Sequence, residues 1–394
     1  MALPLDGIRV IDFGRYIAGP YAAMLLGDMG AEVIRIDRRG GSEDRYLGPV
    51  AESGEGGMFL SINRNKRSLT LDPSKQGADE VIRRLIKSAD VVVANLPMPV
   101  LKKMGIDYDS LKALKPDIVL MMASTFGPDG PYAERVGFDT VVQAMSGAMS
   151  LTGFPGTPVR ALVPFEDYGT ALHGAFGVMT ALFHRQQTGE GQCVDVSLLS
   201  TGVTFMIPFL AERSVTGIKR EQWGNRAFWA GPTDCYKTKD GWVNVAVNGR
   251  PMFKRWARAV GREDLLEDPD LEKDLDRANH ADKLDAVMVP WCKVRVSDEV
   301  IAELEKARVP CGPVFDVDQV LADPHVQARG LLKNVAFPGT ESDPPLADTP
   351  VRLSATPGGI RHRAPLPGEH TDDVLDELGF SAEQVTELKG SEAV

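Results

Sequence analysis

Short apolar segments alternate with helical patterns along the first part of the chain. Four segments of mostly apolar residues have the length of buried strands: residues 8–13, 31–37, 90–96 and 117–125. Three segments with helical periodicity lie between them: residues 18–30, 74–89 and 108–115. This alternation predicts an α/β fold with a mostly parallel sheet that helices cover on both faces. In such sheets, ligands bind beyond the carboxyl ends of the strands.

The pattern is more varied after the last of these strands. Residues 126–166 are rich in glycine and proline, which predicts loops with one helix. Residues 168–187 have helical periodicity and are apolar on most sides, so we expect a buried helix there. A further strand is expected at residues 193–199, and a β-hairpin at residues 234–247. Amphipathic helices follow the hairpin.

Composition excludes several classes of protein. The chain has 394 residues and a net charge of −11, which argues against a nucleic-acid partner. Its four cysteines form no CxxC pair and have no histidine cluster beside them, so we expect neither a metal site nor a disulfide framework. They fit a reducing, cytoplasmic location. The apolar stretch at residues 203–211 is too short to span a membrane.

The loop after the first predicted strand is a candidate dinucleotide site. It reads DFGRYIAGP and lacks the G-x-G-x-x-G fingerprint of nicotinamide-dependent enzymes. Asp37 ends the second strand, where an acid binds the ribose of NAD, but Arg38 and Arg39 follow it and suit a phosphorylated ribose better. We favour a Rossmann-like sheet without a nicotinamide cofactor. An NAD(P)-dependent dehydrogenase stays the alternative from another enzyme class.

Basic residues border three strands of the predicted sheet. They are Arg38 with Arg39, residues 63–68, and Lys102 with Lys103. If these loops share one edge of the sheet, they form a pocket for a nucleotide with several phosphates. The alternative is solvated surface charge, which is usual for Lys and Arg.

Asp167 stands beside Glu166 where the buried helix is expected to begin. Asp is a preferred N-cap residue, so a purely structural role is one interpretation. The same position supports a catalytic interpretation, because the positive end of a helix keeps a nearby carboxylate ionised. An ionised, oriented carboxylate is what a nucleophile requires. Position alone leaves both interpretations open.

Several stretches together resemble the class III CoA-transferase family, which includes formyl-CoA transferase and carnitine CoA-transferase. The resemblance covers nearly the whole chain and depends on the order and spacing of its motifs: LPLDGIRVIDFGRYIAGPYAAMLLGDMGAEVIRID, NRNKRSLTLD, GIDYDSLKALKPDIV, FGPDGPYAERVGFDTVVQAMSGAMSLTG, DYGTALHGAFGVMTALFHRQQTGEGQCVDVSLL and ADPHVQARG.

The resemblance implies that Asp167 is a covalent nucleophile that attacks an acyl-CoA thioester and becomes an aspartyl-CoA thioester. Backbone N–H groups near the start of its helix are expected to stabilise the oxyanions. The substrates are acyl-CoA and a small organic acid, and no tightly bound cofactor is expected. The implied CoA contacts are Tyr16, Ile17, Ala18, Arg38, Lys66, Arg67, Asn95, Lys102 and Arg135.

The resemblance also implies an interlocked homodimer. Residues 1–212 and 326–394 are then expected to form a large Rossmann-like domain, and residues 225–325 a smaller domain of helices and strands.

Two positions depart from branches of this family. The racemase branch has a proton-transferring histidine where this chain has Phe138, which argues against an α-methylacyl-CoA racemase. Formyl-CoA transferase has a run of glycines where residues 221–234 contain only Gly224 and Gly231. Arg226 in this stretch is a candidate for pairing with the acceptor acid. Together with Arg160, it suggests a dicarboxylate acceptor.

Overall fold

The computed structural model describes residues 2–394, which form two compact units. Unit 1 comprises the chain up to Ala148, Ala161–Thr216 and His325–Val394. Unit 2 comprises Met149–Arg160 and Gly217–Pro324. The smaller unit therefore contains two segments, whereas we expected one, and Met149–Arg160 lies in it rather than in the large domain.

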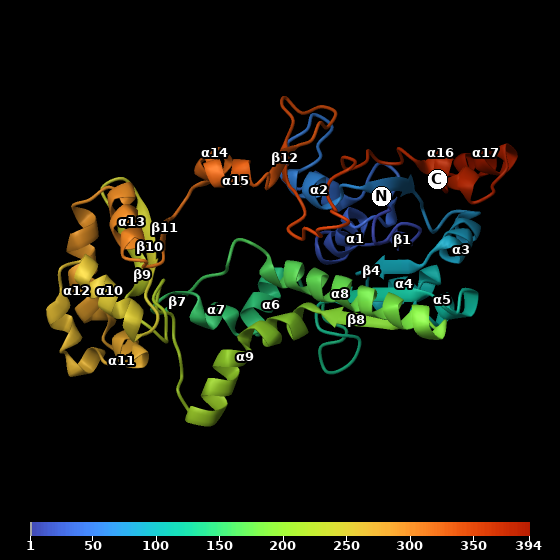
Figure 1. Cartoon of the computed structure of the whole chain (residues 1–394). Helices are drawn as coiled ribbons and strands as arrows, with labels where there is room; N and C mark the ends of the chain where they lie inside the picture. Colours follow the sequence, from blue (N-terminus) through green and yellow to red (C-terminus); the bar gives the residue numbers. More distant parts are fainter. Residues whose placement is uncertain (1) are drawn as a thin grey trace. The chain divides into compact units, whose positions relative to one another are not determined.

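A six-stranded parallel sheet forms the centre of unit 1 (Figure 1). Its strands, in spatial order, are β3 (Lys66–Thr70), β2 (Glu32–Asp37), β1 (Arg9–Asp12), β4 (Val91–Ala94), β5 (Val119–Ser124) and β8 (Cys193–Ser197). The strand order reverses its direction between β1 and β4, which makes this pair the topological switch point of the sheet. The predicted α/β fold with a parallel sheet is confirmed.

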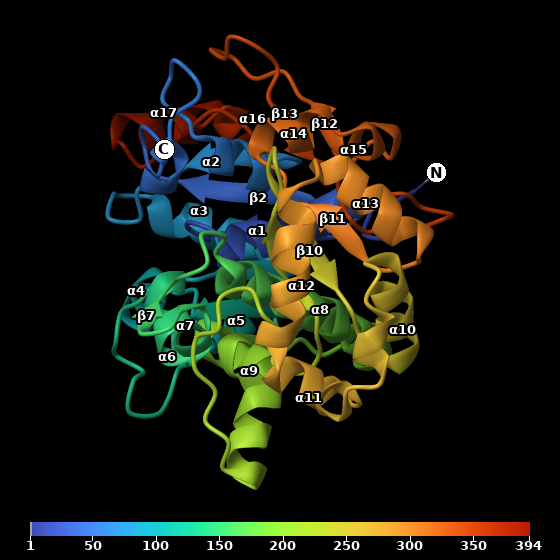
Figure 2. The same cartoon turned by 90° about the vertical axis from the view of Figure 1, so that its left-hand side faces the viewer.

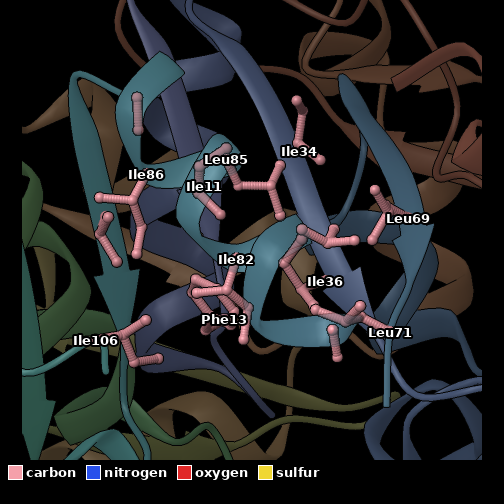
Figure 3. Close-up of a cluster of buried hydrophobic side chains, with 14 of the residues drawn as sticks. Ile11, Phe13, Ile34, Ile36, Leu69, Leu71, Ile82, Leu85, Ile86 and Ile106 are labelled. Atoms are coloured by element: carbon pink, nitrogen blue, oxygen red, sulfur yellow. The ribbon is translucent and has the colours of Figure 1, made fainter. Parts of the chain in front are cut away.

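Alternating side chains of the strands point into two separate cores. Ile11 and Ile34 belong to one cluster, and their neighbours Val10 and Val33 belong to the other. Figure 3 shows the first cluster, in which Ile82, Leu85 and Ile86 meet strand residues such as Ile34. Because both faces are buried, the strands are apolar throughout rather than alternating with polar residues.

Helices cover each face of this sheet. Those of unit 1 are α1 (Ala18–Asp28), α2 (Gly57–Ile62), α3 (Ala78–Ser88), α4 (Met98–Met104), α5 (Tyr108–Leu114), α6 (Asp139–Met145), α8 (Phe165–Thr188), α9 (Leu198–Thr216), α16 (Thr371–Glu377) and α17 (Ala382–Gly390). Residues of α1 and α8 pack on one face, and residues of α3, α5, α16 and α17 pack on the other. The C-terminal helices thus complete a core that the N-terminal strands begin.

The remaining short elements of unit 1 lie near its C-terminal segment and its second strand. They are η1 (Glu43–Tyr46), α15 (Pro324–Ala328) and the antiparallel pair β12 (Leu332–Asn334) and β13 (Pro345–Ala347). The short helix α7 (Ala148–Leu151) and α15 each begin in one unit and end in the other.

Unit 2 has its own antiparallel sheet and core (Figure 2). Its elements are β6 (Gly153–Phe154), β7 (Thr157–Pro158), β9 (Thr233–Lys237), β10 (Trp242–Ala246), α10 (Arg250–Ala259), η2 (Glu263–Leu266), η3 (Pro269–Leu271), α11 (Asp274–Asn279), α12 (Ala281–Lys293), α13 (Ser297–Lys306), β11 (Cys311–Pro313) and α14 (Val317–Ala322). The predicted hairpin is confirmed as the antiparallel pair β9 and β10.

Two elements of unit 1 differ from expectation. Lys66–Thr70 forms strand β3, although its three polar residues at the start suggest a loop. The predicted strand at 193–199 stops at Ser197, and helix α9 begins at Leu198. Ser197 Oγ accepts the N–H of Ser200, the kind of bond that starts a helix. Of the helices in residues 2–394, none is long and apolar enough to cross a membrane.

Candidate active site

Two loops are joined at the switch point of the sheet. The loop after β1 contains Arg15, whose N–H donates to Asn95 Oδ1 at 2.7 Å. The Asn95 side chain follows β4, and its Nδ2 donates to the carbonyl of Arg15, also at 2.7 Å. Gly14 is required here, because a Cβ at this position lies 2.6 Å from Asp12 Oδ1. Asn95 therefore fixes the shape of the place where ligands of such sheets bind.

Tyr16 in the first loop has an unusual backbone conformation. Its φ is +60°, in the left-handed region that few residues other than glycine adopt. Its N–H donates to Asp44 Oδ2 at 3.1 Å, and Asp44 is itself held by Arg35 at 2.7 Å. Such conformations persist only where surrounding contacts impose them. The contacts of Asp44 and Asn95 supply that constraint.

Aromatic contacts place the start of α8 beside this loop. The ring of Phe138 meets the ring of Tyr16 edge to face, with centroids 5.4 Å apart. Tyr168 on α8 makes a similar contact with Tyr21 on α1, at 4.8 Å. Asp167 directly precedes Tyr168, and its N–H donates to Asp139, the residue after Phe138, so the first turn of α8 lies at the same edge of the sheet.

Asp167 is not the N-cap residue of its helix. Helix α8 begins at Phe165, and Pro164 occupies the N-cap position, so Asp167 lies within the first turn. The buried carboxylate of Asp139 caps the helix instead: its Oδ2 accepts the N–H groups of Glu166 at 2.9 Å and of Asp167 at 3.2 Å. The capping interpretation of Asp167 is therefore wrong.

The backbone amides of this turn are already bonded within the protein. Besides the two that donate to Asp139, the N–H of Phe165 donates to the carbonyl of Val163, and that of Tyr168 donates to the carbonyl of Pro164. The expected use of these amides as an oxyanion hole is therefore not supported. Asp139 was also missed, because spacing alone does not reveal that an acid on one helix caps another.

The electrostatics of the turn also differ from expectation. Burial, followed by the negative charge of Asp139, raises the pKa of Asp167 to about 7. The positive helix end does not keep this carboxyl group acidic, since the carboxylate of Asp139 already occupies it. Asp167 is thus ionised only in part at neutral pH. A carboxylate destabilised in this way is a stronger base and nucleophile than an ordinary one.

Most predicted CoA contacts lie at the carboxyl edge of the sheet. Tyr16 and Asn95 form the joined loops, Arg38 is exposed after β2, and Lys102 is exposed on α4. Arg135 is exposed and stacks on Tyr132, in the loop before Phe138. The side chains of Ile17 and Ala18, at the start of α1, are buried, which leaves their backbone for any contact with a nucleotide.

The backbone of Lys66 and Arg67 lies at the opposite edge, whereas the Lys66 side chain extends to Asp12 at the end of β1. They begin β3, and Lys66 pairs in register with Val33 near the start of β2, whereas Arg38 follows the end of β2. The three basic segments therefore do not share one edge, which corrects the expected pocket. The basic residue that follows the carboxyl end of β3 is Lys75, which the sequence motif did not indicate.

The charges of Lys66 and Arg67 are also already paired. The Lys66 ammonium group is buried and donates to Asp12 at 2.8 Å, and Arg67 binds Glu32 and Glu377. These residues line a cavity of about 660 Å³ at the amino edge of the sheet. Because acids already pair with Lys66 and Arg67, we do not retain these two residues as phosphate ligands.

Arg226 is in unit 2 and its guanidinium group is surrounded by acids. It binds Asp282 at 2.7 Å, makes a further ion pair with Asp285, and lies 3.6 Å from Asp234. Its charge is neutralised within the unit. This arrangement does not support the expected pairing of Arg226 with an acceptor acid.

Fold and site together define an α/β protein of the doubly wound class, with its ligand edge at the switch point and a partly exposed, weakly acidic carboxyl group beside it. The chain belongs to CoA-transferase family III, whose model matches residues 5–371. This assignment replaces the dehydrogenase alternative and does not favour the racemase.

Proteins similar to this chain carry related descriptions. Succinyl-CoA–D-citramalate CoA-transferase of Chloroflexus aurantiacus is 31% identical, over 99% of this chain and 98% of that protein. Succinate–glutarate CoA-transferase of Agrobacterium fabrum is 34% identical, over 95% and 96%. The crystal structure of a CAIB/BAIF family protein from Brucella suis is 32% identical, with a TM-score of 0.85 over 96% of this chain and 100% of that one.

Proposed function

We propose that this protein transfers CoA from an acyl-CoA to a free dicarboxylic acid, with Asp167 as the covalent nucleophile. One observation carries the assignment to Asp167. Of the two adjacent acids in the first turn of α8, Glu166 is 0% exposed, whereas Asp167 is partly exposed. Only Asp167 is accessible to a substrate at the edge of the sheet where Tyr16 and Asn95 meet.

The proposed chemistry exchanges one thioester for another. An Asp167 oxygen attacks the thioester carbonyl, and CoA leaves as the thiolate, which produces a mixed anhydride. The thiolate then attacks the Asp167 carboxyl carbon and releases the donor acid, leaving an aspartyl-CoA thioester. The acceptor carboxylate reverses these steps. Because the overall reaction exchanges one CoA thioester for another of similar energy, no ATP is consumed, and CoA is a substrate rather than a tightly bound cofactor.

The acceptor is proposed from the relatives. Succinyl, citramalate and glutarate in their names are all dicarboxylic. The test is an exchange assay that measures transfer of CoA from succinyl-CoA to isotopically labelled acids. We expect glutarate and other dicarboxylates to accept CoA, and monocarboxylates of equal length to react poorly. Transfer to monocarboxylates alone would contradict the proposed acceptor class but not the nucleophile.

The pH profile of exchange follows from the raised pKa of Asp167. The nucleophile must be ionised, and its pKa of about 7 makes the ionised fraction fall as the pH is lowered through neutrality. Below pH 7, we expect kcat/KM to decrease tenfold for each pH unit.

Asp139→Asn removes a negative charge that raises the pKa of Asp167 while keeping an oxygen that accepts a backbone N–H. The acidic limb of the kcat/KM profile should then move to lower pH in this variant. An unmoved limb in a folded variant would show that Asp139 does not influence Asp167.

We propose that two copies of the chain form a homodimer through α8 of unit 1, because this helix carries an exposed apolar stripe. Leu172, Phe176, Met179 and Phe183 are exposed and lie at the spacing of one helix face, and Phe176 is 75% exposed. Contiguous exposed apolar surface of this kind marks an interface, and a second copy of the chain fits the family resemblance. A cytoplasmic location stays a prediction.

Phe176→Glu is expected to shift the protein from dimer to monomer, because the charge interrupts the stripe at its most exposed residue. Light scattering after size-exclusion chromatography measures the mass. Leu114→Glu is the matched control, since Leu114 is exposed at the end of α5, which packs on the other face of the sheet. A wild-type monomer, or a Phe176→Glu dimer as stable as the wild type, would contradict the proposed interface.

A further inference from the structure

Glu166 is a buried acid with an incomplete set of partners. Its side chain is 0% exposed, and within residues 2–394 its Oε2 has no hydrogen-bond partner. Its Oε1 lies 3.3 Å from Ser146 Oγ. Burying an ionised carboxylate without a cation or several donors is costly, so such a group usually takes up a proton instead.

The surroundings of Glu166 contain negative rather than positive charge. Helix α6 presents Asp139, whose Oδ2 accepts the Glu166 N–H, and α8 presents Asp167. On the same helix, His173 faces the hydroxyl group of Thr201 on α9. In the described part of the chain, no Lys or Arg pairs with Glu166, and no group of three or more His, Cys, Asp or Glu is arranged to hold a metal ion. A proton is therefore the counter-charge that the geometry favours.

The hydrogen bonds around Ser146 fit a protonated Glu166. Ser146 Oγ lies 3.5 Å from the carbonyl oxygen of Gln143, to which it can donate its single hydrogen. When that hydrogen goes to Gln143, Ser146 Oγ has lone pairs left to accept the O–H of a protonated Glu166. This gives a chain from the acid through the hydroxyl to the carbonyl of α6. Burial also raises the pKa of Glu166 to about 7, which favours the protonated form relative to an ordinary glutamate.

Glycine on α9 makes room for the acid. A Cβ at Gly202 lies 2.7 Å from Glu166 Oε1 and 2.7 Å from the Cβ of Ser146, so any larger residue displaces the carboxyl group. Close packing of α8 and α9 through this glycine fixes the side chain of Glu166 in one place. The first turn of α8, with Asp167 on it, is held by the same contact.

We propose that Glu166 is a positioning residue: a neutral carboxylic acid that donates its O–H to Ser146 and, seated against Gly202, orients the first turn of α8 so that Asp167 is the ionised group. This proposal depends on the proposed function, in which Asp167 is the nucleophile. It assigns the two adjacent acids opposite protonation states in the active enzyme.

Glu166→Gln tests the proposal, because glutamine has the shape of the neutral acid and its amide N–H can donate to Ser146. We expect exchange activity at pH 7 to stay within about fivefold of wild type, on the order of one neutral hydrogen bond. The acidic limb of kcat/KM should move by less than about half a pH unit, since Asp167 keeps an uncharged neighbour. Gly202→Ala, which displaces the carboxyl group, should lower kcat with little change in the KM for acyl-CoA.

Thermal unfolding gives a readout that does not depend on activity. A raised pKa in the folded state means that stability falls as the pH rises from the unfolded value of about 4.5 through about 7. Glu166→Gln removes this loss, so its melting temperature should rise relative to wild type between pH 5 and 8. Glu190→Gln is the matched control, because Glu190 is exposed, and its difference from wild type should stay constant.

Two outcomes overturn the proposal: a folded Glu166→Gln variant that loses exchange more than 100-fold, or an acidic limb that moves by a full unit or more. Either shows that an ionised Glu166 takes part in the active state. Asp167→Asn, measured in parallel, separates the proposals. If Asp167→Asn keeps full activity, the proposed function fails. If Asp167→Asn is inactive and Glu166→Gln gives either of the two outcomes above, only the proposed role of Glu166 fails.

Discussion

Asp167→Asn is expected to lower CoA exchange by at least about 10⁴-fold, the order of magnitude for loss of a covalent nucleophile. An amide oxygen does not attack a thioester at a useful rate, and no aspartyl thioester can form. The side chain keeps its size, and the N–H groups of the first turn keep their acceptor in Asp139. Folding and acyl-CoA binding should therefore stay close to wild type. Exchange of labelled acid and a binding titration measure the two effects separately.

Trapping the intermediate gives a direct test of the same residue. Borohydride added during turnover reduces an aspartyl-CoA thioester to homoserine, and peptide mass spectrometry then locates the change. We expect the modification at position 167 in the wild-type protein. Asp129→Asn is the matched control, since Asp129 is an exposed acid in a loop and its loss should leave exchange unchanged. Full turnover with an unmodified Asp167 would contradict the covalent mechanism.

Asp37→Ala is expected to destabilise the protein by about 3–5 kcal/mol, the usual effect of removing one partner from a buried ion pair. Asp37 is fully buried and accepts from Arg35 at 3.0 Å, from Arg45 at 2.6 Å and from Ser68 at 2.8 Å. Its removal leaves two buried guanidinium groups with fewer partners. Urea unfolding followed by circular dichroism measures the loss.

The pH dependence of this effect has a definite sign. The arginines hold the pKa of Asp37 well below its usual range, although burial opposes them. The stabilisation is therefore present above the unfolded pKa of about 4 and is lost as the pH falls below it. The difference between wild type and Asp37→Ala should shrink in acid. Glu43→Ala is the control: Glu43 is an exposed partner of Arg38, and its removal should cost about 0.5 kcal/mol or less. A loss below 1 kcal/mol for Asp37→Ala would contradict the importance of the buried network.

Local pattern was enough for the strands and helices that are buried on both sides. The strands at Arg9–Asp12 and Val91–Ala94 are apolar runs with clear limits, and they were predicted. Strand β3 was missed because it begins with Lys66, Arg67 and Ser68. Lys66 is tolerated in the sheet only because Asp12, on a strand far away in the sequence, neutralises it. A contact over such a separation leaves no periodic signal.

The candidate site shows the same division. The motif around Asp167 indicated the residue that we propose as the nucleophile, since the order of motifs along the chain is specific even where each one is not. Its capping role and its acidity were predicted wrongly, because both depend on Asp139, which lies 28 positions earlier in the chain and reaches the start of α8 only in the folded state. Gly202 and Glu166, which meet in the same way, are even farther apart in the sequence.

The sequence by itself determined the α/β class, the parallel sheet, the family and the residue proposed as nucleophile, because apolar periodicity and motif order are local properties of the chain. Only the tertiary structure decided which basic residues share an edge with that carboxyl group and which acids surround it. Direction of strands places Arg38 and Lys66 at opposite edges. Burial and through-space charge set the protonation of Asp167 and Glu166, and both arise only when separate helices are brought together.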